Sequence, residues 1–117
     1  MKLRPMALQA DRTLVKSPPE LWELADDPEL QSRWCAALLG AGDPVPVAVT
    51  RRERGERIAW RSTGSRPAAE VELTLAEKGF GTKVAISAAG GRNAAGDVLE
   101  SLLDELGSPQ RRPFARA

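Results

Sequence analysis

The chain has 117 residues, a formal net charge of +1, 42% hydrophobic residues and 28% charged residues, which fits one globular domain and leaves no room for two. It contains no His, no Tyr and one Cys, so Ser-His-Asp and Cys-His catalytic arrangements, His-ligated zinc and internal disulfide bonds are excluded. The nearly balanced charge provides no global field toward nucleic acid or an anionic bilayer, so any such binding requires a local patch.

The N-terminal segment and the single cysteine bear on location. Residues 1–10 include Lys2 and Arg4 but no apolar stretch of signal-peptide length, and no window of the chain reaches the roughly 18 apolar residues of a membrane helix. Cys35 has no CxxC partner, which fits a reducing compartment. We therefore predict a cytoplasmic protein with one domain over residues 1–117, no membrane span, no metal and no cofactor.

A strand and a short helix are predicted first. Residues 8–15 have moderate strand character. Ser17 can cap a helix whose first position is Pro18, and Glu20 three residues after the cap completes a capping box. The apolar residues of this helix are Leu21, Trp22, Leu24 and Ala25.

A second helix is predicted directly after the first. The residue before Pro28 is pushed out of the helical conformation, which ends the first helix at Asp26-Asp27. Asp27 then caps the second helix, Pro28 occupies its first position, and Gly40 ends it. One apolar face carries Leu30, Trp34 and Leu38.

From Val45 onward the hydrophobic period changes to two, which predicts four antiparallel strands connected as a meander. The segments Arg54-Gly55 and Gly79-Phe80-Gly81 are typical of hairpin turns. Arg51 continues the alternation that Val47 and Val49 begin, so we expect these three on one face. The other alternating positions are Ile58, Trp60, Ser62, Val71, Leu73, Leu75, Thr82, Val84 and Ile86.

The last predicted element is a helix after Gly90-Gly91, with Asn93 as a candidate cap and Gly107 at its end. Its apolar stripe must lie on the sheet. The fold class is therefore α+β, with a curved antiparallel sheet wrapped around a C-terminal helix and two short helices after the first strand. We expect residues 108–117 to form a flexible basic tail. The stripe consists of Val98, Leu99, Leu102, Leu103 and Leu106.

Residues 12–22, followed by Asp27-Pro28-Glu29-Leu30 and Trp34, resemble the opening of START-like domains, also called the SRPBCC or polyketide-cyclase and lipid-transport superfamily. Residues 58–62, 71–75 and 81–84 are similar to the middle strands of the same proteins. The resemblance implies a helix-grip fold with a ligand cavity between the concave sheet and the C-terminal helix. The family typically has further strands before the one that holds Trp60 and a longer C-terminal helix, so this chain resembles a shortened member with a smaller cavity.

Two classes of function remain. The first is a small-molecule binding module that performs no covalent chemistry and holds an apolar or amphipathic ligand between the sheet and the C-terminal helix. The second is a protein-interaction or self-association domain with a closed cavity, acting as a homodimer or on a protein partner. A cyclase-type enzyme is a distant third, because it would have to work without His or Tyr. The predicted ligand-lining residues are Trp34, Trp60, Leu73, Ile86, Leu99 and Leu103.

The remaining polar candidates have simpler structural interpretations. Asp26, Asp27 and Glu29 could supply an acid and a base, but capping at a helix junction explains them better. Cys35 is expected to be a small buried hydrophobe rather than a reactive thiol. The arginines of residues 51–66 could bind phosphate, but nearby glutamates favour a solvated sheet face with mixed charges, and we expect no nucleic-acid partner.

Overall fold

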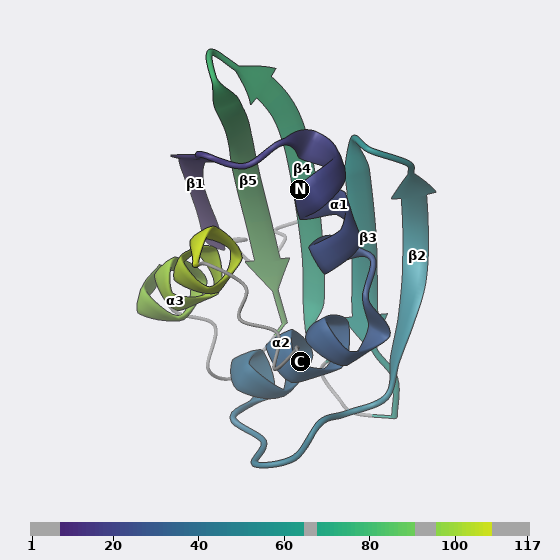
Figure 1. Ribbon diagram of the computed structural model, residues 1–117. Helices are drawn as coiled ribbons and strands as arrows, with labels where there is room; N and C mark the ends of the chain where they lie inside the picture. Colours follow the sequence, from purple (N-terminus) through teal and green to yellow (C-terminus); the bar gives the residue numbers. More distant parts are fainter. Residues whose placement is uncertain (1–7, 65–67, 91–95, 109–117) are drawn as a thin grey trace, which may run out of the picture.

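The computed structural model describes residues 8–64, 68–90 and 96–108, and it contains one five-stranded antiparallel sheet with three helices (Figure 1). The expected cap Asn93 and the predicted tail beyond Ser108 lie outside the described residues. The strands are β1 (Leu8–Leu14), β2 (Val47–Glu53), β3 (Arg57–Ser62), β4 (Glu70–Lys78) and β5 (Gly81–Ala89), and the helices are α1 (Pro18–Ala25), α2 (Pro28–Leu39) and α3 (Gly96–Gly107).

The order of strands in the sheet is β1-β5-β4-β3-β2, so β2 to β5 form the predicted meander and β1 adds to its far edge. All three helices cover the same face of the curved sheet (Figure 1). The predicted α+β fold class is confirmed. In the described part of the chain, no helix has both the length and the apolar character needed to cross a bilayer.

The helix ends follow the predicted capping chemistry. The Ser17 side chain accepts a hydrogen bond from the Glu20 backbone N–H at 3.4 Å, and Asp27 Oδ1 accepts one from the Glu29 N–H at 3.0 Å. Gly40 ends α2 in the left-handed conformation with φ 71°, which glycine adopts without steric cost. These caps fix where α1 and α2 start and stop, and so how they lie against the sheet.

The core lies between the helices and the inward face of the sheet. Alternate residues of β3, β4 and β5 are buried, as the period of two predicts, and α3 contributes the expected apolar stripe. Trp34 of α2 and Trp60 of β3 meet at its centre, with ring centroids 6.0 Å apart and ring planes tilted by 48°. The buried Gln31 amide donates to the Ala25 carbonyl at 2.9 Å, which ties α2 to the end of α1.

A bulge in β2 overturns one expectation about the arginines. The register shifts between Val49 and Arg51, so Arg51 lies opposite Ala59 and Arg52 lies opposite Ile58. Arg51 is therefore on the outer face, and the prediction that it shares the face of Val47 and Val49 is wrong. The extra residue, Thr50, reverses the alternation, and Arg52 now points to the helix side.

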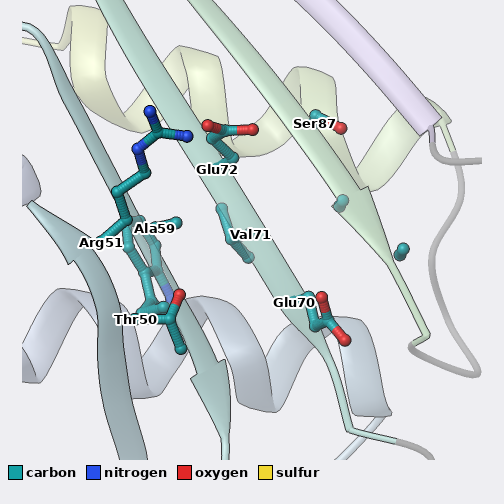
Figure 2. Close-up of a pocket in the computed structure, with 10 residues that line it drawn as sticks. Thr50, Arg51, Ala59, Glu70, Val71, Glu72 and Ser87 are labelled. Atoms are coloured by element: carbon teal, nitrogen blue, oxygen red, sulfur yellow. The ribbon is translucent and has the colours of Figure 1, made fainter.

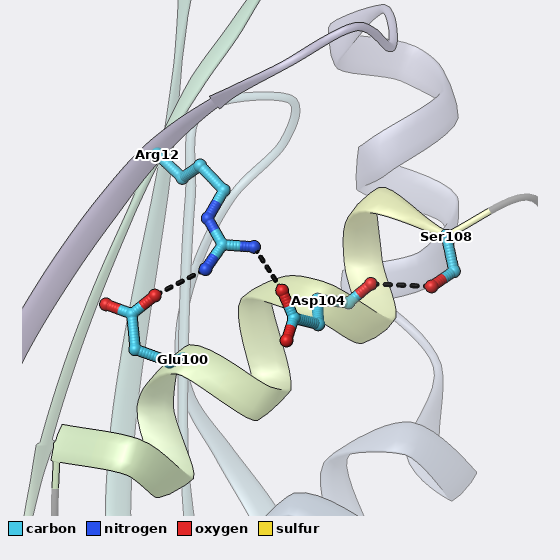
Figure 3. A network of polar contacts seen from close by, with 4 residues as sticks. All are labelled: Arg12, Glu100, Asp104 and Ser108. Carbon is cyan, nitrogen blue, oxygen red and sulfur yellow. Dashed lines mark hydrogen bonds and ion pairs between the residues drawn. The ribbon is translucent and has the colours of Figure 1, made fainter.

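Polar side chains hold α3 in place at its middle and at its C-terminal end (Figure 3). Arg12 of β1 forms ion pairs with Glu100 and Asp104, and these two carboxylates raise the pKa of its guanidinium. Toward the end of the helix, the Ser108 hydroxyl donates to the Asp104 carbonyl at 2.7 Å and Lys16 Nζ donates to the Ser108 carbonyl at 2.7 Å. The helix that covers the core is thus fastened to the second half of β1 and to the residue segment that follows it.

Candidate functional site

The six predicted ligand-lining side chains come together in the core. They arise from α2, β3, β4, β5 and α3, so the topology gathers them between the sheet and the helices as expected. Their exposed fractions are at most 1%, which means that in this conformation they pack as core rather than line an open pocket. The six residues are Trp34, Trp60, Leu73, Ile86, Leu99 and Leu103.

Cys35 also lies in this core. It is fully buried, and its thiol donates a weak hydrogen bond to the Ala69 carbonyl at 3.8 Å. Burial raises the pKa of the Cys35 thiol from its ordinary value of 9.0 to about 11, and the Trp60 indole N–H offsets part of that rise. That indole nitrogen has no hydrogen-bond partner of ordinary geometry, so we regard its contact with the sulfur as weak. Cys35 is therefore the inert buried hydrophobe that was predicted.

We expect the Cys35 thiol to make stability depend on pH at alkaline values. Its folded pKa lies above the unfolded value, so the contribution is present below about pH 9 and is lost as the pH rises through about 11. A shift of this size corresponds to about 2 to 3 kcal/mol in the free energy of unfolding. Urea titrations at several pH values should show this loss, and the Cys35→Ala variant should lack it. An identical pH profile for both proteins would contradict the assignment.

A cleft opens on the helix side of the sheet, between α1 and the β2–β3 hairpin. Its volume is about 330 Å³. Trp22, Glu23 and Asp26 of the α1 segment form one wall, and Arg52 and Arg54 form the other. Trp22 is part of the core cluster and retains 8% exposure, so the cleft reaches the edge of the core. The bulge in β2 is what turns Arg52 toward it.

The two walls of this cleft carry opposite charges. Arg52 donates across it to Asp26 Oδ1 at 2.9 Å, which closes one end with a half-exposed ion pair. Arg54 makes no ion pair with any described carboxylate, and Glu23 likewise has no described cationic partner. The cleft therefore combines an aromatic edge with a guanidinium that is available to a ligand.

The outer face of the sheet carries a larger, open hollow of about 410 Å³ (Figure 2). Thr50 and Arg51 stand on its β2 side and Ser87 on its β5 side, with Glu70 and Glu72 between them. Small side chains such as that of Ala59 make up its floor.

Ion pairs within β2 and between β3 and β4 neutralise several of the charged side chains on this outer face. Arg51 pairs with Glu53 at 2.7 Å, and Arg57 pairs with Glu72 at 3.5 Å. These contacts confirm the expected mixed-charge face. Trp60 also lines this hollow, but only 1% of its surface is exposed. The guanidinium on the rim of the hollow, that of Arg51, is engaged by Glu53, whereas that of Arg54 in the helix-side cleft is available.

Residues 8–64, 68–90 and 96–108 contain no group of three Cys, Asp or Glu side chains arranged to hold a metal ion. The three carboxylates considered as acid and base are explained by structure instead. Asp27 caps α2, Asp26 follows α1 and pairs with Arg52, and Glu29 supplies the capped N–H.

No sequence pattern predicts that Trp22, Arg52 and Arg54 are neighbours. The sequence predicts Trp22 on the first helix and the arginines of residues 51–66 on a solvated sheet face, with no contact between them. Thr50 is an ordinary β-branched residue, and neither Gly nor Pro marks the bulge. No local signal could have placed Arg52 on the helix side.

Comparison with known proteins supports the fold. No protein-family model matches the sequence, and no curated protein matches it significantly. The solved structure of DR_A0006 from Deinococcus radiodurans superposes with a TM-score of 0.64 and 19% identity, covering 87% of this chain and 95% of that one. CalU16 from Micromonospora echinospora gives 0.56 and 22% identity, covering 86% and 73%. The Aha1 dimer from Colwellia psychrerythraea, solved in solution, gives 0.58 and 14% identity, covering 87% and 93%.

At these identities the similarity shows a shared fold and carries no function. The architecture is consistent with the START-like (SRPBCC) fold that the sequence resemblance implied.

Proposed function

We propose that this domain is a START-like binding module for an amphipathic small molecule with an anionic group, and that it performs no covalent chemistry. The observation that carries the proposal is the helix-side cleft of about 330 Å³, bounded by Trp22 and by Arg52 and Arg54. Its volume lies at the lower end of the range for small-molecule sites. It also lies on the side of the sheet where the family resemblance implies a ligand.

The chemistry of the cleft favours an anionic head group on the hairpin wall. A guanidinium binds carboxylate or phosphate oxygens through two parallel N–H donors. Arg54 has this capacity available, whereas Arg52 is engaged by Asp26. Glu23 on the opposite wall repels an anion and so directs it toward Arg54. The apolar part of the ligand would then lie against Trp22.

The predicted core lining remains part of this proposal. Beyond Trp22 the apolar part of a ligand would meet the cluster that contains Trp34 and Trp60. These side chains are almost fully buried, so a long apolar tail requires the helices to move away from the sheet. A short tail requires no such movement. We therefore expect short-chain amphiphiles to bind faster than long-chain ones.

Native mass spectrometry of gently purified protein, compared with the denatured sample, tests the proposal directly. We expect an excess mass that disappears on denaturation and that belongs to an anionic amphiphile. If the isolated protein is empty, decanoate serves as a probe in a titration followed by tryptophan fluorescence. The absence of a bound mass together with no response to decanoate would contradict the proposal.

A charge reversal in the cleft should weaken this binding. We expect Arg54→Glu to raise the Kd for decanoate by about tenfold or more, because one charge-assisted contact is replaced by repulsion. The matched control is Arg61→Glu, which makes the same charge change on the outer face of β3, away from the cleft. Equal effects of the two variants on Kd would show that only net charge matters and that the cleft is not the site.

Self-association is the second candidate function. The strand β2 lies at the edge of the sheet, where its outer backbone groups could pair with another chain. The core is closely packed, as expected for a domain that acts through its surface and holds no ligand inside. The Aha1 protein from Colwellia psychrerythraea is a dimer in solution. However, the bulge and the charged run at residues 51–53 are features that discourage edge pairing. The same native mass spectra count subunits: a dimer without bound ligand would favour self-association, and a monomer with an excess mass would favour ligand binding.

A further inference from the structure

The hairpin that joins β4 to β5 ends in an exposed aromatic side chain. Phe80 is fully exposed, and Val15 is 91% exposed. These are the two large apolar side chains that stand out from the surface of the described residues. Gly79 makes the tight turn possible with φ 59°, so the hairpin projects Phe80 outward.

Phe80 and Val15 belong to the same end of the sheet. The register of β1 with β5 ends at the pair Leu14 and Thr82. One residue further, the Cα of Val15 lies 3.5 Å from the position a Cβ on Gly81 would take. Val15 therefore stands directly beside the start of β5, next to the turn that carries Phe80.

Three lysines belong to the strand ends that carry these two apolar side chains. Lys78 is the last residue of β4 and pairs with Gly81, and Lys83 lies opposite Thr13 two residues further along β5. Lys16 follows Val15 directly, and its backbone carbonyl accepts a hydrogen bond from the Thr82 hydroxyl at 2.7 Å.

All the lysines of the described ranges thus gather at this tip. Glu77 is the acidic residue next to them on β4. The local charge is accordingly positive, although the chain as a whole carries only +1.

The tip is also sterically accessible. Figure 1 shows the β4–β5 turn as the outermost point of the molecule at the top of the view, clear of all three helices. Lys16 differs from the other two lysines, because its ammonium donates to the Ser108 carbonyl just after α3; among the described residues it forms no ion pair. An extended surface can therefore approach Phe80 together with Lys78 and Lys83 of the same hairpin.

We propose that this tip docks the domain on an anionic membrane surface. An aromatic side chain that enters the interfacial region, supported by lysines that reach the head groups, is the chemistry of peripheral membrane attachment. A lysine can keep its ammonium at the phosphates while its alkyl stem follows the apolar side chains inward. The positive charge of the tip attracts anionic lipid and repels a second copy of the same tip, so we expect the binding partner to be anionic lipid.

This inference is independent of the proposed ligand site. The tip involves β1, β4 and β5, whereas the cleft lies between α1 and the β2–β3 hairpin. Attachment through a loop tip also needs no spanning helix. A membrane-docking tip would bring a module for amphipathic molecules to the place where such molecules occur.

Co-sedimentation with vesicles tests the proposal on the full chain. We expect binding to phosphatidylcholine vesicles that contain 30% phosphatidylglycerol, and little binding to pure phosphatidylcholine. The double variant Lys78→Glu and Lys83→Glu should lose at least about tenfold in partitioning, and Phe80→Ser about tenfold. Arg61→Glu, which changes an exposed residue near the other end of the sheet, should bind nearly as well as the parent.

A fluorescent label gives a second, positional readout. Cys35 is buried with a raised pKa, so a thiol added at the tip can be labelled selectively at neutral pH. An environment-sensitive dye on Phe80→Cys should shift its emission to shorter wavelength when anionic vesicles are added. The same dye on Gly42→Cys, an open position in the loop after α2, should not shift.

Three results would overturn the proposal. One is equal binding to neutral and anionic vesicles. Another is an emission shift at both labelled positions. The third is a dimer in light scattering that Phe80→Ser converts to monomer without any vesicle binding by the parent, because the tip would then contact a second copy.

Discussion

Replacing Trp60 with alanine should lower the free energy of unfolding by about 3 to 5 kcal/mol. The indole is 99% buried at the centre of the core, beside Trp34. Removing it leaves a large cavity that the neighbouring elements cannot fill, because β3, β4 and α2 are each fixed by their own hydrogen bonds. Urea denaturation followed by circular dichroism measures the effect without relying on tryptophan signal.

The conservative variant Trp60→Phe separates packing from hydrogen bonding. The indole nitrogen is buried without a partner of ordinary geometry, so losing it removes no strong interaction. We expect Trp60→Phe to retain most of the stability that Trp60→Ala loses. A denaturation midpoint of Trp60→Ala equal to that of the parent would mean that Trp60 is not core and that the register assigned to β3 is wrong.

The elements that local chemistry specifies were predictable from the sequence. Ser17 and Asp27 predict the starts of two helices, and each of them caps the helix that follows it. The change of period after Val45 identifies the strands, because a buried face requires every second residue to be apolar. The amphipathic stripe of α3 similarly required a partner surface. These signals depend only on residues within one element, which is why sequence alone was sufficient.

The geometry of the candidate site was less accessible to such reasoning. The cleft brings Trp22 to Arg52 across about thirty positions of the chain, and the inward direction of Arg52 depends on a bulge with no sequence signal. Whether the core lining encloses a cavity depends on the volumes of side chains from five elements together. The topology could be predicted, but the closed packing of Trp34 and Trp60 could not, because packing is decided by tertiary contacts.

A second large loss of stability is expected from Gly90→Ala, which should cost about 2 to 5 kcal/mol. Gly90 follows β5 with φ 84°, a conformation that side chains disfavour. A Cβ at this position would lie 2.0 Å from the Ala68 carbonyl oxygen, far inside van der Waals contact. The obstacle is backbone rather than a flexible side chain, so the end of β5 or the segment before β4 must move to accept the methyl group.

A graded series of glycine variants identifies the cause of that loss. Gly79→Ala has the same kind of positive φ but open space around it, so it should cost only about 1 to 2 kcal/mol. Gly42→Ala has open space and no positive φ, so it should be neutral or slightly stabilising. The urea concentration at the unfolding midpoint should therefore be highest for Gly42→Ala, lower for Gly79→Ala and lowest for Gly90→Ala. Equal losses for Gly79→Ala and Gly90→Ala would show that backbone conformation alone matters, and that β5 does not approach Ala68 as closely as described here.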